Sequence, residues 1–444
     1  MIFLIIAIAA IILYVWDYKI PAMLFFFFFI TAGYDLFSED EMTHLGFITK
    51  GVDFAFFIQM GIITIACFTQ KKYFRIDKFT LCLSIFGSFL VICILNSKFL
   101  IGLSWAEILR SVRYQFFWLV YFIFRSMEKE QLERLLRYLF IITVVLSVLY
   151  LLQIVLDKRI LSGMEAYRID VFGVRLPRFY NQPKMLHFFT VMAIFCNPYQ
   201  GKWKWISTII LVLAFLGAFH RNLYGILTLI LIFGYSFKLS RLNRTYFLLR
   251  LGIILISILT IAGTQFMKSR TFTDLQFVKD GDFAEVEDMD IEMEDFYKST
   301  FTFRLAHLVE RNQYLLEHPK AMLLGAGLLT DDSNNLDRLF DFKIGLLADA
   351  TGEVVQIGTA DISYSPLLIK FGYLGTALYV ALFIYLSVFF YKNKKKHPYA
   401  VFSFLFCILL FGTSFFSISL LMPVNYLLLL MSYVIIQKSK EQYE

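Results

Sequence analysis

The sequence carries little charge. Only 17% of its 444 residues are charged, 59% are hydrophobic, and the mean hydropathy is +0.66. A soluble domain of this length is far less apolar, so the composition excludes that class and indicates a membrane protein. The apolar runs are about 20 residues long and lack the short alternating segments of an outer-membrane barrel. We therefore predict an all-α, polytopic helical membrane protein with about 12 to 13 transmembrane helices and one large extracytoplasmic loop that contains helices.

Cysteine is also scarce. The five cysteines all lie within apolar runs, and none lies in a polar segment. This placement gives neither a disulfide framework nor the ligand spacing of a zinc site. We predict no metal site and no cofactor.

The first apolar run, Met1 to Trp16, lacks a basic leader and a small-residue cleavage site. We therefore expect this run to remain as a span and not to be removed as a signal peptide. The candidate spans are Ile2 to Trp16, Pro21 to Phe37, Leu45 to Phe68, Phe79 to Asn96, Ile108 to Phe124, Leu135 to Leu156, Met185 to Cys196, Trp203 to Phe219, Tyr224 to Phe237, Phe247 to Phe266, Tyr364 to Phe390, Val401 to Phe416 and Leu420 to Ile436.

Basic residues are dispersed between the spans. The formal net charge is +7, but this dispersal is better explained by membrane orientation than by binding of nucleic acid, which we do not expect as a partner. Clusters such as Arg125 to Arg137 and Lys392 to Lys396 alternate with uncharged or mixed connections, and therefore mark the cytoplasmic side. The C-terminus is then cytoplasmic, and the polar interval between Thr264 and Ile362 lies outside.

The polar interval divides the chain into three parts. Residues 1–266 are predicted to form N-terminal transmembrane helices, residues 267–362 a large extracytoplasmic loop, and residues 363–444 C-terminal transmembrane helices. A connection of this length is usually functional or disordered. Its acidic stretch, residues 280–295, lacks the spacing of an EF-hand, so we expect a solvated acidic lobe.

One segment of this loop, Ser299 to His318, is predicted to be a helix that ends before Pro319. On this helix Arg304 and Arg311 are seven residues apart, so they share a face, with His307 close beside them. Apolar residues that include Leu305 and Leu316 centre on another face. We expect that apolar face to lie on the membrane domain.

Several arginines lie on the outer side, where the orientation rule does not explain them. They are Arg110, Arg113, Arg159, Arg168, Arg175, Arg178, Arg221, Arg304 and Arg311. For each one alone, interfacial snorkelling or a salt bridge with the acidic lobe is the commoner account. Together they favour function, because the planar and permanently charged guanidinium suits bidentate contact with phosphate. Their place at the outer edge of the spans suggests a lipid-linked diphosphate as the ligand.

Three short motifs resemble those of one bacterial superfamily. They are Arg304 and Glu310 followed by Pro319, Gly325-Ala326-Gly327, Asp361 and the paired Gly372 and Gly375; Arg175 to Pro183; and His220-Arg221-Asn222. In this order they resemble the O-antigen ligase and polymerase superfamily of bacterial surface glycan assembly. Ligases of that superfamily carry a histidine near the start of the span after the loop, where this chain has Asp361. The chain is therefore more similar to the polymerases.

The resemblance implies a metal-independent glycosyltransferase in the bacterial cytoplasmic (inner) membrane, with its active site facing outside. It would join polyprenyl-diphosphate-linked oligosaccharide units into a surface polysaccharide, either O-antigen or capsule. The implied partners are the lipid-linked donor and acceptor, membrane lipid, a chain-length regulator and a flippase. Two alternatives stay open. One is a ligase that moves glycan from the polyprenyl carrier to lipid A core or another acceptor, and the other is a flippase or transporter of lipid-linked glycan, although no convincing internal repeat supports the latter.

The predicted catalytic residues are Asp361, Arg304 and Arg221. The two arginines would stabilise the departing diphosphate, and Asp361 would be the base for the acceptor hydroxyl. Glu310 and His307 are alternative bases, and Asp361 could instead cap the following helix or pair with an arginine. The predicted substrate-binding residues are Arg178, Arg175, Arg110, Arg113, His307, Arg311 and Glu310.

Overall fold

The structure is a computed structural model. It describes residues 2–38, 40–42, 50–69, 76–162, 165–171, 174–179, 182–238, 300–331, 333, 339–345, 354–358 and 361–441. The predicted span at residues 247–266 and the acidic stretch at residues 280–295 lie outside these ranges.

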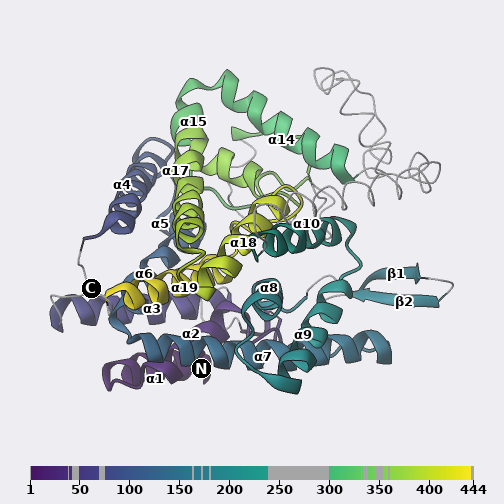
Figure 1. The fold of residues 1–444 in the computed structure, drawn as a ribbon. Helices are drawn as coiled ribbons and strands as arrows, with labels where there is room; N and C mark the ends of the chain where they lie inside the picture. Colours follow the sequence, from purple (N-terminus) through teal and green to yellow (C-terminus); the bar gives the residue numbers. More distant parts are fainter. Residues whose placement is uncertain are drawn as a thin grey trace.

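Helices make up most of the described chain (Figure 1). The α-helices are α1 (Ile2–Val15), α2 (Lys19–Ile30), α3 (Gly51–Thr69), α4 (Lys78–Phe99), α5 (Trp105–Phe116), α6 (Val120–Ser126), α7 (Lys129–Leu156), α8 (Leu186–Cys196), α9 (Gly201–Leu216), α10 (Arg221–Lys238), α14 (Thr300–Glu317), α15 (Pro319–Leu324), α17 (Tyr364–Asn393), α18 (Pro398–Thr413) and α19 (Pro423–Glu441). Two short 3-10 helices are η1 (Asp40–Met42) and η2 (Phe117–Leu119), and two strands are β1 (Glu165–Val171) and β2 (Val174–Phe179).

Four of the described helices are long and apolar enough to cross a membrane: α3, α4, α7 and α17. Several shorter apolar helices, among them α1, α8 and α18, accompany them. Helices satisfy their own backbone hydrogen bonds, which is what lipid requires of a spanning segment. A mostly helical protein with several apolar helices of spanning length is therefore confirmed. The number of spans and the orientation stay predictions.

Within the predicted span from Ile108 to Phe124, the helix changes geometry. Helix α5 gives way to η2 and then to α6. The start of α5 is fixed by a capping box in which the Ser104 hydroxyl accepts from the amide of Glu107 and the Glu107 carboxylate accepts from the amide of Ser104. At its end, Gln59 of α3 donates to the carbonyl of Phe116 at 2.6 Å. The Gln59 side chain thus supplies a hydrogen-bond donor to a backbone carbonyl at the point where the helix changes geometry.

An antiparallel hairpin lies where only an outer loop was expected. Strand β1 pairs with β2, with Ile169 opposite Leu176. Arg175 and Arg178 both lie on β2. The hairpin projects to the side of the helical body, near α9 (Figure 1).

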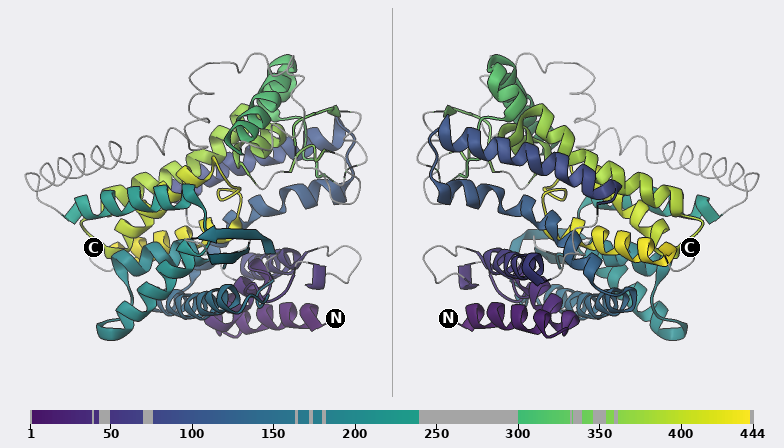
Figure 2. Two further views of the ribbon diagram at one scale, coloured as in Figure 1. Left: turned by 90° about the vertical axis from the view of Figure 1, so that its right-hand side faces the viewer. Right: turned by 90° about the vertical axis from the view of Figure 1, so that its left-hand side faces the viewer.

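The loop helices α14 and α15 lie at one end of the molecule, and α1, α2 and α7 lie at the opposite side (Figures 1 and 2). Both α14 and α15 pack on α17, which in turn packs on α4 and α18. The helix at Thr300–Glu317 and its end just before Pro319 agree with the predicted helix from Ser299 to His318. α17 therefore connects α14 and α15 with the apolar bundle.

Candidate functional site

The first contact of the site joins the loop helix to the entrance of α17. Arg304 Nη2 of α14 donates to Asp361 Oδ1 at 2.8 Å, and the two groups form an ion pair. Asp361 lies three positions before Tyr364, the first residue of α17. The Arg304 side chain is buried and lies over the ring of Phe416, whereas the Asp361 side chain keeps 31% of its surface exposed. The pair therefore offers a carboxylate that solvent and ligands can reach.

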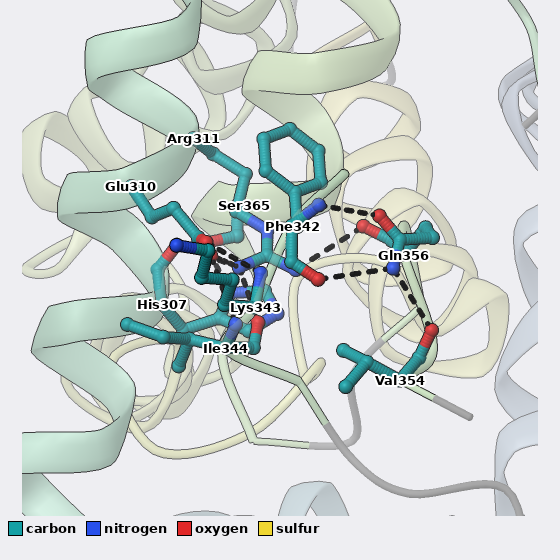
Figure 3. Close-up of polar contacts among 9 residues, drawn as sticks. All are labelled: His307, Glu310, Arg311, Phe342, Lys343, Ile344, Val354, Gln356 and Ser365. Atoms are coloured by element: carbon teal, nitrogen blue, oxygen red, sulfur yellow. Dashed lines mark hydrogen bonds and ion pairs between the residues drawn. The ribbon is translucent and has the colours of Figure 1, made fainter. Parts of the chain in front are cut away.

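The second contact lies one helical turn further along α14. His307 Nδ1 and Ser365 Oγ share a hydrogen bond of 2.9 Å (Figure 3), and both residues are buried. Burial, with the nearby charge of Arg311, lowers the pKa of His307 to about 3. The imidazole is therefore neutral at physiological pH. Its Nε2 atom is buried and has no hydrogen-bond partner among the described residues.

The third contact joins α14 to two segments of the loop between α15 and α17 (Figure 3). Arg311 is only 1% exposed. Its Nη1 donates to Glu310 Oε2 at 2.5 Å and to the carbonyl of Ile344, and its Nη2 donates to the carbonyl of Gln356 at 3.2 Å. Burial lowers the pKa of Arg311 to about 10, although Glu310 opposes the shift, so the guanidinium remains charged at neutral pH.

Glu310 binds the same loop as Arg311 through backbone amides. Its Oε1 accepts from the amide of Lys343 at 2.7 Å, and its Oε2 accepts from the amide of Ile344 at 3.2 Å. Burial raises the pKa of Glu310, and the charge of Arg311 and these two amides oppose the rise. The Gln356 side chain forms two hydrogen bonds with the backbone of Phe342: it accepts from the amide and donates to the carbonyl. Two loop segments are thereby tied to α14.

The expected packing of α14 is wrong in one respect. The face with Arg304, His307 and Arg311 is the buried one, whereas Leu316 is 59% exposed and Leu305 is only partly covered. The polar face can be buried because each of its residues finds hydrogen-bond acceptors or donors on α17 or the loop. Hydrophobicity alone therefore gave the wrong side of this helix.

The residues that follow α15 make close backbone contacts with α17 near Gly372. Gly372 has φ 63° and ψ −169° inside α17, so the helix is broken there. The carbonyl of Ile369, which precedes the break, accepts from the amide of Ala326 at 2.7 Å. Gly325 has φ 80°, and a Cβ atom on it would overlap the backbone of Lys370. Both glycines are required, since an L side chain would be strained and crowded at either position.

The other predicted arginines lie on other elements. Arg178 Nε donates to the carbonyl of Ala218, just past the end of α9, at 3.0 Å. Arg110 Nε donates to the carbonyl of Ala106 on its own helix at 3.4 Å. Arg113 forms an ion pair with Asp53 of α3. The side chains of Arg175, on β2, and Arg221, at the first position of α10, lie outside the described part of the structure.

The structure thus brings together Arg304, His307, Glu310, Arg311 and Asp361. Sequence reasoning missed Ser365 and Gln356, which hold His307 and the loop. A serine at the second position of the span after the loop was the available signal for Ser365. Gln356 gave none, because its role depends on a loop that folds back over α14. No group of three or more potential metal ligands occurs among the described residues.

No family model and no curated protein matches the chain. A cation, Arg304, and a partly exposed carboxylate, Asp361, lie together where a polar loop meets an apolar helix. Such a pair can stabilise a developing anion and accept a proton from a hydroxyl. The contacts of Arg311 and Glu310 attach two loop segments to α14.

Proposed function

We propose that the protein is a polymerase of lipid-linked oligosaccharides. It would join polyprenyl-diphosphate-linked repeat units into a surface polysaccharide at the outer face of a bacterial cytoplasmic membrane. The observation that carries this proposal is the Arg304–Asp361 pair at the junction of α14 and α17. The motif resemblance, with Asp361 where ligases of that superfamily carry a histidine, points the same way.

The reaction follows from the two side chains. The glycosidic bond between the donor sugar and its polyprenyl diphosphate breaks, and the diphosphate departs with the electron pair. Arg304 stabilises the charge that develops on the departing phosphate oxygen. A hydroxyl of the acceptor unit attacks the same sugar carbon, and its proton passes to Asp361. The leaving group is already a good one, so holding donor and acceptor in place is the larger task of the protein.

The loop contacts support a rigid site. Glu310 and Arg311 fix α14 to two loop segments, and the backbone contacts that follow α15 fix the same helices to α17. Because Arg304 and Asp361 come from different elements, their 2.8 Å contact depends on both attachments. Pre-organisation of this kind lowers the cost of orienting charged groups in the transition state.

The test is the glycan profile of cells that lack the gene. The deletion strain, complemented with wild-type protein, should regain long chains, whereas Arg304→Gln or Asp361→Asn should leave single lipid-linked units. Lys320→Gln, an exposed lysine on α15, is the control with a matching loss of charge on the outer loop. Each variant is compared at equal membrane abundance.

The same experiment separates the alternatives. Long chains that stay on the polyprenyl carrier in the deletion strain would identify a ligase. Lipid-linked units retained on the inner leaflet, with little polymer made, would identify a flippase. A chain-length regulator and a flippase are the proposed protein partners, and they would be recovered with the protein from membranes.

A further inference from the structure

The turn between α18 and α19, residues 414–422, is held against the entrance of α17 by hydrogen bonds. The amide of Ser363 donates to the carbonyl of Ser414 at 2.9 Å, and the Ser363 hydroxyl donates to the carbonyl of Ser417 at 2.7 Å. At the base of the turn, the hydroxyls of Thr413 and Ser419 share a hydrogen bond of 2.8 Å. These bonds give the turn a fixed position beside the residues that lead into α17.

Two aromatic rings of this turn contact the surroundings of the Arg304–Asp361 pair. The guanidinium carbon of Arg304 lies 5.7 Å from the ring centroid of Phe416. The ring of Phe415, the preceding residue, lies against the ring of Tyr364, with 4.9 Å between the centroids and 46° between the planes. Because Arg304 is paired with Asp361, the charge pair and these rings form one continuous group of contacts.

Phe415 is exposed by the fold itself. Its side chain is 51% exposed although hydrogen bonds fix the turn that carries it, and Tyr364 is only partly buried. The faces of aromatic rings are electron-rich, so they attract the weakly positive C–H groups on the apolar face of a sugar ring. An aromatic anchor at a membrane interface needs no charged neighbours, whereas ligand sites combine apolar walls with a few placed polar groups. Phe415 and Tyr364 lie beside such groups.

We propose that Phe415 and Tyr364 form a sugar-binding subsite, on which the sugar ring next to the lipid diphosphate stacks. This inference rests on the proposed polymerase function, in which Arg304 binds the diphosphate and Asp361 accepts the proton of the attacking hydroxyl. The sugar carbon that reacts must lie between those two groups, and its ring is then next to the turn. The ligand class is the carbohydrate of a lipid-linked oligosaccharide, bound by ring stacking and not by charge.

Substitutions that separate aromatic from apolar character test the subsite. Phe415→Leu keeps an apolar side chain but removes the ring face, whereas Phe415→Trp keeps a ring. In membranes supplied with the native lipid-linked substrate at a limiting concentration, Phe415→Leu should lower the polymerisation rate about 3- to 10-fold. Phe415→Trp should retain the rate, and so should the control Phe99→Leu, since Phe99 is also exposed but lies at the end of α4. Equal rates for Phe415→Leu and Phe415→Trp would overturn the proposal.

Crosslinking identifies the bound molecule directly and does not depend on a loss of activity. A benzophenone-bearing phenylalanine analogue is introduced at position 415 of the full-length protein in cells that make the native substrate. Illumination should attach sugar-labelled, lipid-linked glycan to position 415 and not to position 99. Adducts with phospholipid alone would identify a membrane contact and overturn the sugar-binding subsite.

The two experiments also separate this proposal from the one on which it rests. If position 415 captures lipid-linked glycan while the deletion strain makes chains of normal length, the polymerase function fails and the subsite stands. If the deletion strain lacks long chains but position 415 captures only phospholipid, the polymerase function stands and the subsite fails.

Discussion

Arg311 lies on the face of Phe342, with its guanidinium carbon 4.3 Å from the ring centroid. Arg311 is buried, and the same guanidinium bonds two loop carbonyls. Arg311 is therefore a structural residue first, and its effects on activity should follow from its effects on stability.

Arg311→Gln should destabilise the protein by about 3 to 5 kcal/mol, because it leaves Glu310 and the loop carbonyls without a cation. Denaturant unfolding of purified protein measures the loss. Arg168→Gln is the control, since Arg168 is also ion-paired, with Asp157 at 2.6 Å, but both side chains are exposed. That exposed pair should contribute less than about 1 kcal/mol. Equal losses in the two variants would contradict the structural role of Arg311.

His307 should make stability fall in mild acid. Its pKa is about 3 in the folded protein and 6.5 in the unfolded chain, so the unfolded state binds more protons below pH 6.5. Stability is then lost as the pH falls from 6.5 towards 3, with a slope approaching about 1.4 kcal/mol per pH unit.

The measurement is unfolding between pH 7.5 and 4.5 for wild type and His307→Gln. Glu310 acts in the opposite sense, because a raised pKa adds stability as the pH falls through that window. Both proteins keep Glu310, so their difference isolates His307. Parallel pH profiles would show that His307 is not buried in its neutral form.

Alanine at the helix break should be costly. Gly372→Ala forces a side chain into φ 63° and brings its Cβ within 2.6 Å of the carbonyl oxygen of Met322. We expect a loss of about 2 kcal/mol or more. Gly87→Ala is the control, because Gly87 lies inside α4 and nothing lies within 4 Å of the added carbon. It should be neutral or stabilising by up to about 1 kcal/mol, and thermal unfolding of the two variants compares them directly.

Arg304 and Asp361 should depend on each other in activity. In the proposed reaction both groups act in the transition state, so Arg304→Gln and Asp361→Asn are each expected to lower the polymerisation rate by about 100-fold or more. Arg304→Lys should not restore the rate, because an ammonium group cannot reproduce the planar fork. If the double variant shows the product of the two single losses, the two residues act independently and the pair is not a functional unit.

Much of the helical framework could be predicted from the sequence, because apolar runs of spanning length leave the backbone few alternatives. The end of α14 before Pro319 was also predictable, since proline restricts the residue that precedes it. The buried face of α14 was not. Its partners Asp361 and Ser365 lie 57 and 58 residues further along the chain, and hydrophobicity does not report such distant hydrogen bonds. The hydrogen bond from Gln59 to the carbonyl of Phe116, where α5 gives way to a 3-10 turn, likewise joins residues far apart in the sequence.

The bond from Ala326 to Ile369 has a consequence for engineering. The loop that follows α15 supplies a donor to a carbonyl near the break in α17, so the hydrogen bonding of this helix is completed by residues from outside it. A loop taken from a related protein would have to bring its own amide to that position and its own glycine opposite Lys370. Chimaeras that exchange the loop at the ends of the spans should therefore lose α17 as well, whereas chimaeras cut at the break, with the loop and residues 361–372 moved together, should keep it.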